Sequence, residues 1–546
     1  MLRMSTLPLP EMEIERDAER PEPPLTAEGL LRRRALQRPD GAALFDPPNR
    51  SVLGLGHARN YTYREADAAV DALASFFIEI GLDPGDRIAV QLPNLALQPL
   101  VLLAAWRAGL AGAMLPMLWR GYEIGRVCEA IEPKALIGIA SFVGGKQCEE
   151  LCRVAAPHLS VRFVLGFGHD LPDGVISLDE AILGHGPSRR AIEAPPRKGP
   201  ALINFTARAG LALVPIYRSE DELLALGAMT VLAMSLDSRD VILNPYPLTG
   251  PVGLSLGLAS WLISGAVLAQ HQPFDYGVFV QQLLDTSATV TALPSPILAE
   301  LAKDGVLHEP KCGLRRLGAV WSTYDHTLPL SLGTGALLFD LYPLGDLASV
   351  VLRRETRTRH SPLPLGPVKV GEDGDGAVFV ETRLETGDAL GYESLGDGEI
   401  MLRGPVVPCG AVYGPLARDA DGFVATGLHA AIENGIAPSL QIVRDPELLH
   451  HGGAAIAASE LDGLYQAYPG FLDAACFALP DPILCDRIFA AVSPKPGQSV
   501  SLETLHQFLE DRQVAPYKFP DRLLVVKEIP RDATGRILRD QILAQV

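Results

Sequence analysis

The sequence predicts an α/β fold with largely parallel sheets. Short apolar runs of strand length recur at residues 87–92, 135–139, 161–164 and 241–244. Helical stretches lie between these runs, such as the amphipathic stretch that ends at Phe77. Strands that alternate with helices are typical of parallel sheets covered by helices, because each helix returns the chain to the end of the sheet at which the previous strand began.

Length, net charge and cysteine content limit which kinds of protein this chain can be. A chain of 546 residues predicts several domains with large cores. The net charge of −18 argues against a nucleic-acid binder, which needs a basic face to displace counterions. The seven cysteines have no metal-like spacing and predict reduced thiols in a cytoplasmic protein. Cys148 and Cys152, four residues apart, are interpreted as helix-face residues rather than ligands.

No targeting or membrane segment is predicted. Residues 1–25 are acidic and proline-rich, lack the basic start and apolar run of a signal peptide, and are expected to form a loose tail. The apolar runs 96–115 and 254–269 invite a membrane interpretation, but the first contains Arg107 and the second is short for a bilayer span. Buried helices and strands explain both runs better.

A series of short motifs follows one order from residue 61 to residue 539. They are Tyr61–Glu65, Gly81–Asn94, Phe274–Asp275, Val290–Ser295, Gly398–Pro405, His451–Glu460 and Ile529–Arg539. Each motif is weak by itself. Their collinear order resembles that of the AMP-forming acyl-CoA synthetases, within the adenylate-forming superfamily.

The resemblance implies a division into two domains. A large N-terminal part (26–444) would hold parallel sheets with helices and a small distorted barrel, and a small α+β domain (445–546) would follow. The boundary falls at the family's hinge motif, here Arg444–Glu447, with a departure at Pro446. Proline fixes φ near −65°, so we expect the rotation of the C-terminal domain to be restricted.

The resemblance also implies ligands and an activity. Members join a carboxylate to CoA through ATP with Mg²⁺, so ATP or AMP, Mg²⁺ and CoA or acyl-CoA are the expected cofactors, and a small carboxylate or acyl-CoA is the expected partner. A homodimer or a partner protein is compatible with the sequence. Nucleic acid and a membrane span are not expected.

The phosphate-binding loop departs from the family pattern. Its place is taken by residues 206–214, which read TARAGLALV, so that Thr206 and Gly210 are retained while the lysine falls near Leu213. In the family the loop cradles phosphates with backbone N–H groups, hydroxyls and that lysine. Arg208 and Arg218 are candidate replacements, but a planar guanidinium does not substitute simply for an ammonium. The alternative is that both are solvated surface arginines.

The motif for adenine, α-phosphate and Mg²⁺ is half present. The run 342–346 reads YPLGD, which keeps the aromatic residue as Tyr342, replaces the threonine by Gly345 and shortens the acid to Asp346. The resemblance makes Tyr342 an adenine contact and Asp346 a catalytic acid and metal ligand, which reaches a hard cation through water. The alternative is that Asp346 only caps a turn.

The ribose site lacks its acid. The run 423–428 reads FVATGL, which puts Leu428 where the family has an aspartate that accepts hydrogen bonds from both ribose hydroxyls. A leucine there leaves buried hydroxyls unpaired. Arg444 matches the arginine that approaches the ribose, and a structural ion pair is the alternative role.

The adenylation lysine is replaced by Arg536 in the run 530–539, PRDATGRILR. In the family this lysine reaches the carboxylate and the α-phosphate in the transition state, so its geometry matters more than its charge. Lys518 and Lys527 lie nearby, but neither lies in a matching motif. Arg536 is therefore the candidate catalytic residue at this position.

Two further features resemble the family's thioester site. Gly452 and Gly453 match a glycine pair that lies beside the pantetheine tunnel, and a tight turn between strand and helix is the alternative. The apolar run 274–296 would line an acyl pocket or form core.

Two hypotheses follow. The first is an acyl-CoA synthetase-like protein with an eroded ATP site, a pseudoenzyme or weak enzyme that binds an acyl or aryl carboxylate or acyl-CoA. The second is an active AMP-forming acyl- or aryl-CoA ligase whose rebuilt nucleotide site uses Arg208, Asp346, Arg444 and Arg536.

Overall fold

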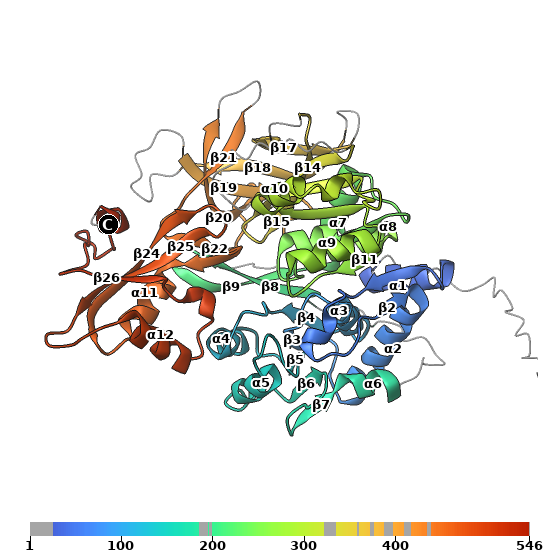
Figure 1. Cartoon of the computed structure of the whole chain (residues 1–546), viewed down its shortest axis with the longest axis horizontal. Coiled ribbons are helices and arrows are strands. Elements are labelled where there is room, and N and C mark those ends of the chain that lie inside the picture. Colours follow the sequence, from blue (N-terminus) through green and yellow to red (C-terminus); the bar gives the residue numbers. More distant parts are fainter. Residues whose placement is uncertain are drawn as a thin grey trace, which may run out of the picture.

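The computed structural model describes residues 26–184, 195, 199–321, 335–356, 360–371, 376–386, 397–408, 416–433 and 438–544. They form four sheets with helices packed around the first two and the last (Figure 1). The predicted tail, residues 1–25, lies outside the described residues. Within the described residues, no helix combines the length and the apolar character needed to cross a membrane.

The first sheet has seven strands, parallel except for its last pair. Its order is β7 (Val175–Ser177), β6 (Phe163–Phe167), β5 (Ala135–Ile139), β3 (Arg87–Val90), β4 (Ala111–Met114), β8 (Leu202–Arg208) and β9 (Leu211–Arg218). Its helices are α3 (Leu97–Arg107), α4 (Gly121–Ile131), α5 (Gln147–Ala155) and α6 (Leu178–Gly184). The predicted strands 87–92, 135–139 and 161–164 correspond to β3, β5 and β6, and the parallel α/β prediction is confirmed.

The second sheet has eight strands and is also mainly parallel. Its order is β15 (Ala348–Arg353), β14 (Leu337–Leu344), β13 (Arg316–Val320), β12 (Val290–Pro294), β10 (Val241–Asn244), β11 (Val267–Gln270), β1 (Ala42–Phe45) and β2 (Asn60–Thr62). The helices of this part are α1 (Ala27–Gln37), α2 (Tyr63–Glu79), α7 (Glu220–Met234), the π-helix η2 (Gly253–Ala259), α8 (Ser260–Ser264), α9 (Tyr276–Asp285) and α10 (Ser295–Lys303).

Local sequence explains where these helices begin. Thr62 caps α2 in a capping box with Glu65, and Ser219 caps α7 in the same way with Glu222. Each pair satisfies N–H groups that the first helical turn leaves without partners. The amphipathic stretch predicted to end at Phe77 is α2.

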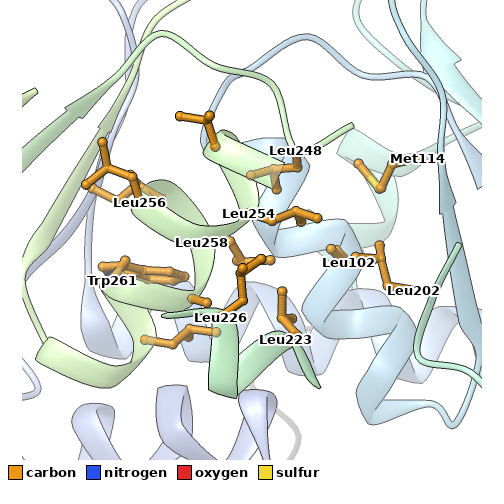
Figure 2. Close-up of a cluster of buried hydrophobic side chains, with 14 of the residues drawn as sticks. Leu102, Met114, Leu202, Leu223, Leu226, Leu248, Leu254, Leu256, Leu258 and Trp261 are labelled. Atoms are coloured by element: carbon orange, nitrogen blue, oxygen red, sulfur yellow. The ribbon is translucent and has the colours of Figure 1, made fainter. Parts of the chain in front are cut away.

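One apolar cluster joins the first two sheets (Figure 2). Leu102 of α3 and Leu202 of β8 face Leu223 and Leu226 of α7, and η2 with α8 completes the cluster. Both apolar runs considered as membrane segments, 96–115 and 254–269, are largely buried in this core. Their hydrophobicity is therefore explained by packing.

The third sheet is antiparallel and has six strands. Its order is β16 (Leu363–Pro364), β21 (Ser439–Val443), β20 (Val424–Glu433), β19 (Asp397–Arg403), β18 (Ala377–Glu385) and β17 (Gly366–Val370). It occupies the place of the small barrel that the resemblance implies. The chain leaves it at Val443 and enters the fourth sheet five residues later.

The fourth sheet belongs to the C-terminal region and packs beside β8 and β9 (Figure 1). Its order is β23 (Ala454–Ala457), β22 (Leu448–His451), β25 (Cys485–Pro494) and β24 (Phe471–Asp481), and β26 (Arg522–Val525) pairs with β25. Its helices are α11 (Ala458–Gln466), α12 (Leu502–Asp511) and α13 (Arg539–Leu543).

Candidate functional site

A β-hairpin stands where the sequence comparison predicts a phosphate-binding loop. Strand β8 runs through Thr206 to Arg208, and β9 returns from Leu211 with Thr206 opposite Val214. The turn is formed by Ala209 and Gly210, whose φ is +78°. Backbone N–H groups in an antiparallel ladder donate to neighbouring strands instead of converging on an anion.

The interpretation of Arg208 and Arg218 as solvated surface residues is wrong. Arg208 is 6% exposed and donates from Nη2 to the Ala425 carbonyl at 2.9 Å. Arg218 is 1% exposed and donates to the carbonyls of Leu347 and Val406. Both side chains therefore tie the hairpin to elements that follow it by more than a hundred residues.

Burial disfavours the charged form of the Arg208 guanidinium. It lowers the pKa of the guanidinium to about 10, although Glu399 and Asp346 act in the opposite direction. Its Nε and Nη1 groups have no hydrogen-bond partner in the described part of the chain. The side chain packs against Gly427 so closely that a Cβ on that glycine would lie 2.3 Å from Arg208 Nη1.

A small cavity of about 80 Å³ lies between the large N-terminal part and the C-terminal sheet. Its walls come from β8, β14, β20, β21, β22, β23 and β25. The lining residues are Thr206, Ala207, Trp321, Pro343, Gly345, Asp346, Thr426, Leu428, Ile442, Leu448, His450, Gly453, Ala455 and Cys485. Among the predicted site residues, it brings together Thr206, Asp346 and Gly453.

Asp346 lies in a turn and faces this cavity. Its φ is +58°, and the preceding Gly345 packs so tightly that a Cβ there would lie 2.0 Å from the Thr426 carbonyl oxygen. Burial raises the pKa of the Asp346 carboxyl, although a hydrogen bond with Thr206 and the charge of Arg208 oppose this. The turn that was the alternative role is present, and the carboxyl also faces the cavity.

The cavity residues do not fit ATP with Mg²⁺ in this arrangement. The described lining contains one carboxylate and neither lysine nor arginine, and no group of three or more potential metal ligands occurs in the described residues. Pockets that bury a drug-sized ligand usually measure about 300–1,000 Å³, several times this volume.

Tyr342 and Leu428 occupy different environments. Tyr342 is 2% exposed and donates from its hydroxyl to the Ser361 carbonyl at 2.6 Å, so its ring belongs to the core and is outside the cavity lining. Leu428 lines the cavity beside Thr426, whose hydroxyl donates to the Ile400 carbonyl. The predicted adenine contact and the ribose position are therefore not presented on one surface.

Arg444 forms the structural ion pair that was its alternative role. Its Nε lies 2.8 Å from Oδ1 of Asp486, and its Nη2 donates to the Ala478 carbonyl. Asp486 is fully buried and also accepts the backbone N–H of His450. Arg444 thus anchors the connection between the last two sheets.

Gly452 and Gly453 form the turn between β22 and β23. Their φ values of +58° and +87° require left-handed backbone at both positions, which glycine adopts without strain. The turn joins two strands, so the expected strand-to-helix turn is wrong in this detail. Gly453 lines the cavity.

Arg536 lies away from the cavity lining. It ends a turn stabilised by Asp532, and its Nη2 is 3.8 Å from Glu447 Oε1, within the predicted hinge motif. Glu447 also binds Arg539 at 3.1 Å. Gly453 therefore lies at the cavity, and the candidate catalytic arginine lies beside Glu447.

Sequence reasoning missed a buried charge network between the domains. Lys518 is 4% exposed and lies 3.0 Å from Glu123 of α4 and 2.9 Å from Glu460 of α11. Burial acts to lower the pKa of the ammonium, but Tyr517 and the two carboxylates outweigh it and raise the pKa. The only sequence signal was a lysine within the apolar run 514–520.

Neighbouring contacts extend this interface. The Trp119 indole donates to the Tyr517 hydroxyl at 3.0 Å, and the Ala515 backbone donates to Glu123 Oε1. Arg126 contacts Glu460 at 3.0 Å. The C-terminal sheet is therefore held on the N-terminal part by several buried polar contacts.

Comparison with known proteins identifies the family. The AMP-binding enzyme model matches residues 31–322, and the model of the AMP-binding enzyme C-terminal domain matches residues 460–536. The chain belongs to the AMP-binding enzyme family. This confirms the resemblance to adenylate-forming synthetases.

Curated relatives have low identity over nearly full length. A salicylyl-CoA synthase / salicylate adenylyltransferase from Streptomyces sp is 27% identical, with 88% of this chain and 89% of that protein covered. A medium-chain fatty-acid–CoA ligase from Escherichia coli is 23% identical, with 90% and 86% covered.

Solved structures confirm the fold. The amide bond synthetase McbA from Marinactinospora thermotolerans has a TM-score of 0.75 at 17% identity, with 95% of this chain and 99% of that chain covered. The o-succinylbenzoate CoA synthetase from Bacillus subtilis has a TM-score of 0.73 at 20% identity, with 94% and 98% covered.

Proposed function

We propose that this chain is an acyl-CoA synthetase-like protein with an eroded nucleotide site. It is weak or inactive in adenylation and binds an acyl or aryl carboxylate or an acyl-CoA. The observation that carries the proposal is the hairpin β8–β9, in which buried Arg208 packs against Gly427 where relatives of this family would be expected to hold phosphate and ribose.

The cavity supports the choice of an acyl thioester group over a triphosphate. Its lining mixes apolar side chains with Asp346, His450 and the hydroxyls of Thr206 and Thr426, and contains neither lysine nor arginine among the described residues. A triphosphate would bring several negative charges without a cationic partner, which is strongly unfavourable in a buried site. The thioester group at the acyl end of an acyl-CoA is uncharged, so we infer that this end reaches the cavity while the phosphates of CoA stay outside it.

The orientation of the C-terminal region is consistent with this proposal. Gly453 is at the cavity, whereas Arg536 is at the hinge beside Glu447. We infer that the domain boundary lies between residues 444 and 445. We also infer that the chain works in the cytoplasm, and that a homodimer or partner protein is compatible with its function.

The second candidate is an active AMP-forming acyl- or aryl-CoA ligase. Family membership and the ligases among its relatives favour it. This candidate requires Arg208, Asp346, Arg444 and Arg536 to leave their present contacts and form a nucleotide site with Mg²⁺.

Isothermal titration separates the two candidates. The protein is titrated with ATP and Mg²⁺, and separately with octanoyl-CoA and benzoyl-CoA. We expect heat of binding from an acyl-CoA and none from ATP, and no ATP–pyrophosphate exchange with fatty or aromatic acids. Tight binding of ATP with exchange at the rate of an ordinary ligase would establish the second candidate.

A further inference from the structure

Charged side chains hold the crossing between the third and fourth sheets from two sides. Arg444 is bound within the C-terminal region, because its Nε lies 2.8 Å from the buried carboxylate of Asp486. Glu447 is bound there too, at 3.1 Å from a guanidinium of α13. Asp445, between them, is bound to the N-terminal part instead, since its Oδ2 lies 3.3 Å from Nδ1 of His429 in β20. Rotation of the C-terminal region about this crossing therefore has to break the pair of Asp445 with His429.

The backbone beside Asp445 depends on the same residue. Its Oδ1 accepts the N–H of Glu447 at 2.8 Å, and its backbone carbonyl accepts the N–H of Leu448 at 3.3 Å. One carboxylate oxygen thus shapes the turn into β22, while the other holds the third sheet. His429 lies opposite Val443, the last residue of β21, in the antiparallel ladder. The pair therefore spans the point at which the chain leaves the third sheet.

The surroundings of the pair leave His429 as the group that titrates near neutral pH. The other charged or titratable side chains that face the pair come from β19, β22 and the C-terminal segment, and they are Asp397, Glu399, His450 and Arg536. Arginine and carboxylates keep their charge near neutral pH. Burial lowers the pKa of the His450 imidazole, which is therefore neutral in this range. The hydrogen bond with Asp445, followed by the charges of the nearby carboxylates, raises the pKa of His429 although burial opposes this.

We propose that His429 and Asp445 form a pH-sensitive clasp on the pivot of the C-terminal region. Protonated His429 holds Asp445 in an ion pair and keeps the crossing closed. As the pH rises, the imidazole loses its proton, the ion pair is reduced to a hydrogen bond with one charged partner, and the crossing opens more often. The clasp acts on the scaffold and goes beyond the proposed function, so it applies to either candidate function.

Hydrogen–deuterium exchange measured by mass spectrometry tests the clasp in the full chain. The peptide that contains the N–H groups of Glu447 and Leu448 is followed from about pH 6 to about pH 9. Each rate is divided by the intrinsic rate of an unstructured peptide of the same sequence. In the wild type, the corrected opening should rise by about fivefold, the usual weight of a partly exposed ion pair. The rise should begin near pH 6.5, the ordinary pKa of histidine, and level off above the raised pKa of the closed form.

Three variants identify the groups. His429→Gln keeps a neutral hydrogen-bond donor, so its opening should be independent of pH and equal to that of the wild type at the high end of the range. Asp445→Asn keeps an acceptor for the Glu447 N–H and should also abolish the pH dependence. His308→Gln replaces an exposed histidine of the short helix Val306–His308 and should behave like the wild type.

The results that overturn the clasp are distinct from failure of the proposed function. A wild-type profile that stays flat over this pH range overturns the clasp without any variant. A pH dependence that persists in His429→Gln or Asp445→Asn, each shown by circular dichroism to be folded, overturns it as well, and so does its loss in His308→Gln. Acyl-CoA binding is measured separately by calorimetry, so its absence overturns the proposed function alone.

Discussion

The guanidinium of Arg208 and the backbone of Gly427 are in direct contact, and this contact joins the first sheet to the third. A Cβ on Gly427 would lie 2.3 Å from Arg208 Nη1 and 2.8 Å from Arg208 Cδ. The φ of Gly427 is also +77°. In the family's terms, the replaced phosphate loop and the ribose motif touch each other, which leaves little space between them for a ligand.

The contact predicts a stability difference between two glycines. Gly210→Ala introduces a methyl group at φ +78° with no atom within 4 Å, so we expect a loss of about 1 kcal/mol in unfolding free energy. Gly427→Ala adds a steric overlap with Arg208, which should cost roughly 1–3 kcal/mol more. Urea denaturation of the two variants measures the difference.

An Arg208→Ala background provides the control. There Gly427→Ala should cost only about as much as Gly210→Ala, because the overlap is gone. Equal losses for both glycines in the presence of Arg208 would mean that the guanidinium moves aside easily and does not fill this space.

The second prediction concerns the orientation of the C-terminal region. Lys518→Met leaves Glu123 and Glu460 buried without their cation. Docking of the C-terminal region on the N-terminal part should therefore weaken by about 3 kcal/mol. This corresponds to a change of about 100-fold in the equilibrium between docked and open forms. Small-angle scattering and the rate of proteolysis in residues 444–447 measure the opening. Lys495→Met, at an exposed site, is the matched control.

In the wild type, the C-terminal region should keep one orientation relative to the N-terminal part, with or without ligand. Pro446 removes torsional freedom beside the hinge, and the Lys518 network adds buried contacts across the interface. If Lys518→Met scatters like the wild type, the network does not hold the orientation. If the wild type itself shows two widely different orientations, the restriction at Pro446 is absent as well.

The third prediction is a pH dependence at the hinge. A hydrogen bond with Asp445 raises the pKa of His429, with Glu399 and Asp397 acting in the same direction. Burial acts to raise the pKa of Asp445, but the hydrogen bonds from His429 and the Glu447 backbone, with the charges of His429 and Arg536, outweigh it and lower the pKa. Both shifts favour the ion pair between His429 and Asp445.

The directions of the two pKa shifts determine how the stability contribution of this ion pair varies with pH. The contribution of His429 is full below its unfolded pKa of 6.5 and is lost as pH rises through the higher folded value. That of Asp445 is full above 3.8 and is lost as pH falls through the lower folded value. The stability difference between wild type and His429→Gln should therefore be largest between pH 3.8 and 6.5. A difference that is constant up to pH 9 would contradict this assignment.

The sequence predicts those strands whose own residues form a continuous apolar run. Apolar runs gave Ala135–Ile139 and Val241–Asn244 with the bounds that the structure has, because a strand buried in a parallel sheet is apolar on both faces. The run at 161–164 predicted its strand too early, since the strand is Phe163–Phe167.

The environments of charged residues could not be predicted. Arg208, Arg218 and Lys518 look like surface residues in the sequence, and their burial depends on partners up to about 400 positions away, such as Glu123 for Lys518. The motif alignment located Thr206, Asp346 and Gly453 near one cavity, but it also placed Tyr342 there, which the structure buries in the core. Whether a retained motif residue faces the ligand depends on packing that no local pattern records.

The last prediction is that Arg536→Lys alone will not produce adenylation. A lysine at this position acts only on ATP and a carboxylate that are already held in line, because it stabilises charge in the transition state through geometry. The residue lies beside Glu447, outside the cavity lining, while Leu428 offers no acceptor for the ribose and the hairpin at Thr206–Val214 does not direct its N–H groups at a phosphate. Restoration should require Leu428→Asp and a rebuilt loop together with the lysine, with non-additive gains. ATP–pyrophosphate exchange across the single and combined variants measures this, with Lys527→Arg as a control for a charge-preserving change. Robust acyl-adenylate from Arg536→Lys alone would show that the nucleotide site is functional, and the active ligase would replace the proposed function.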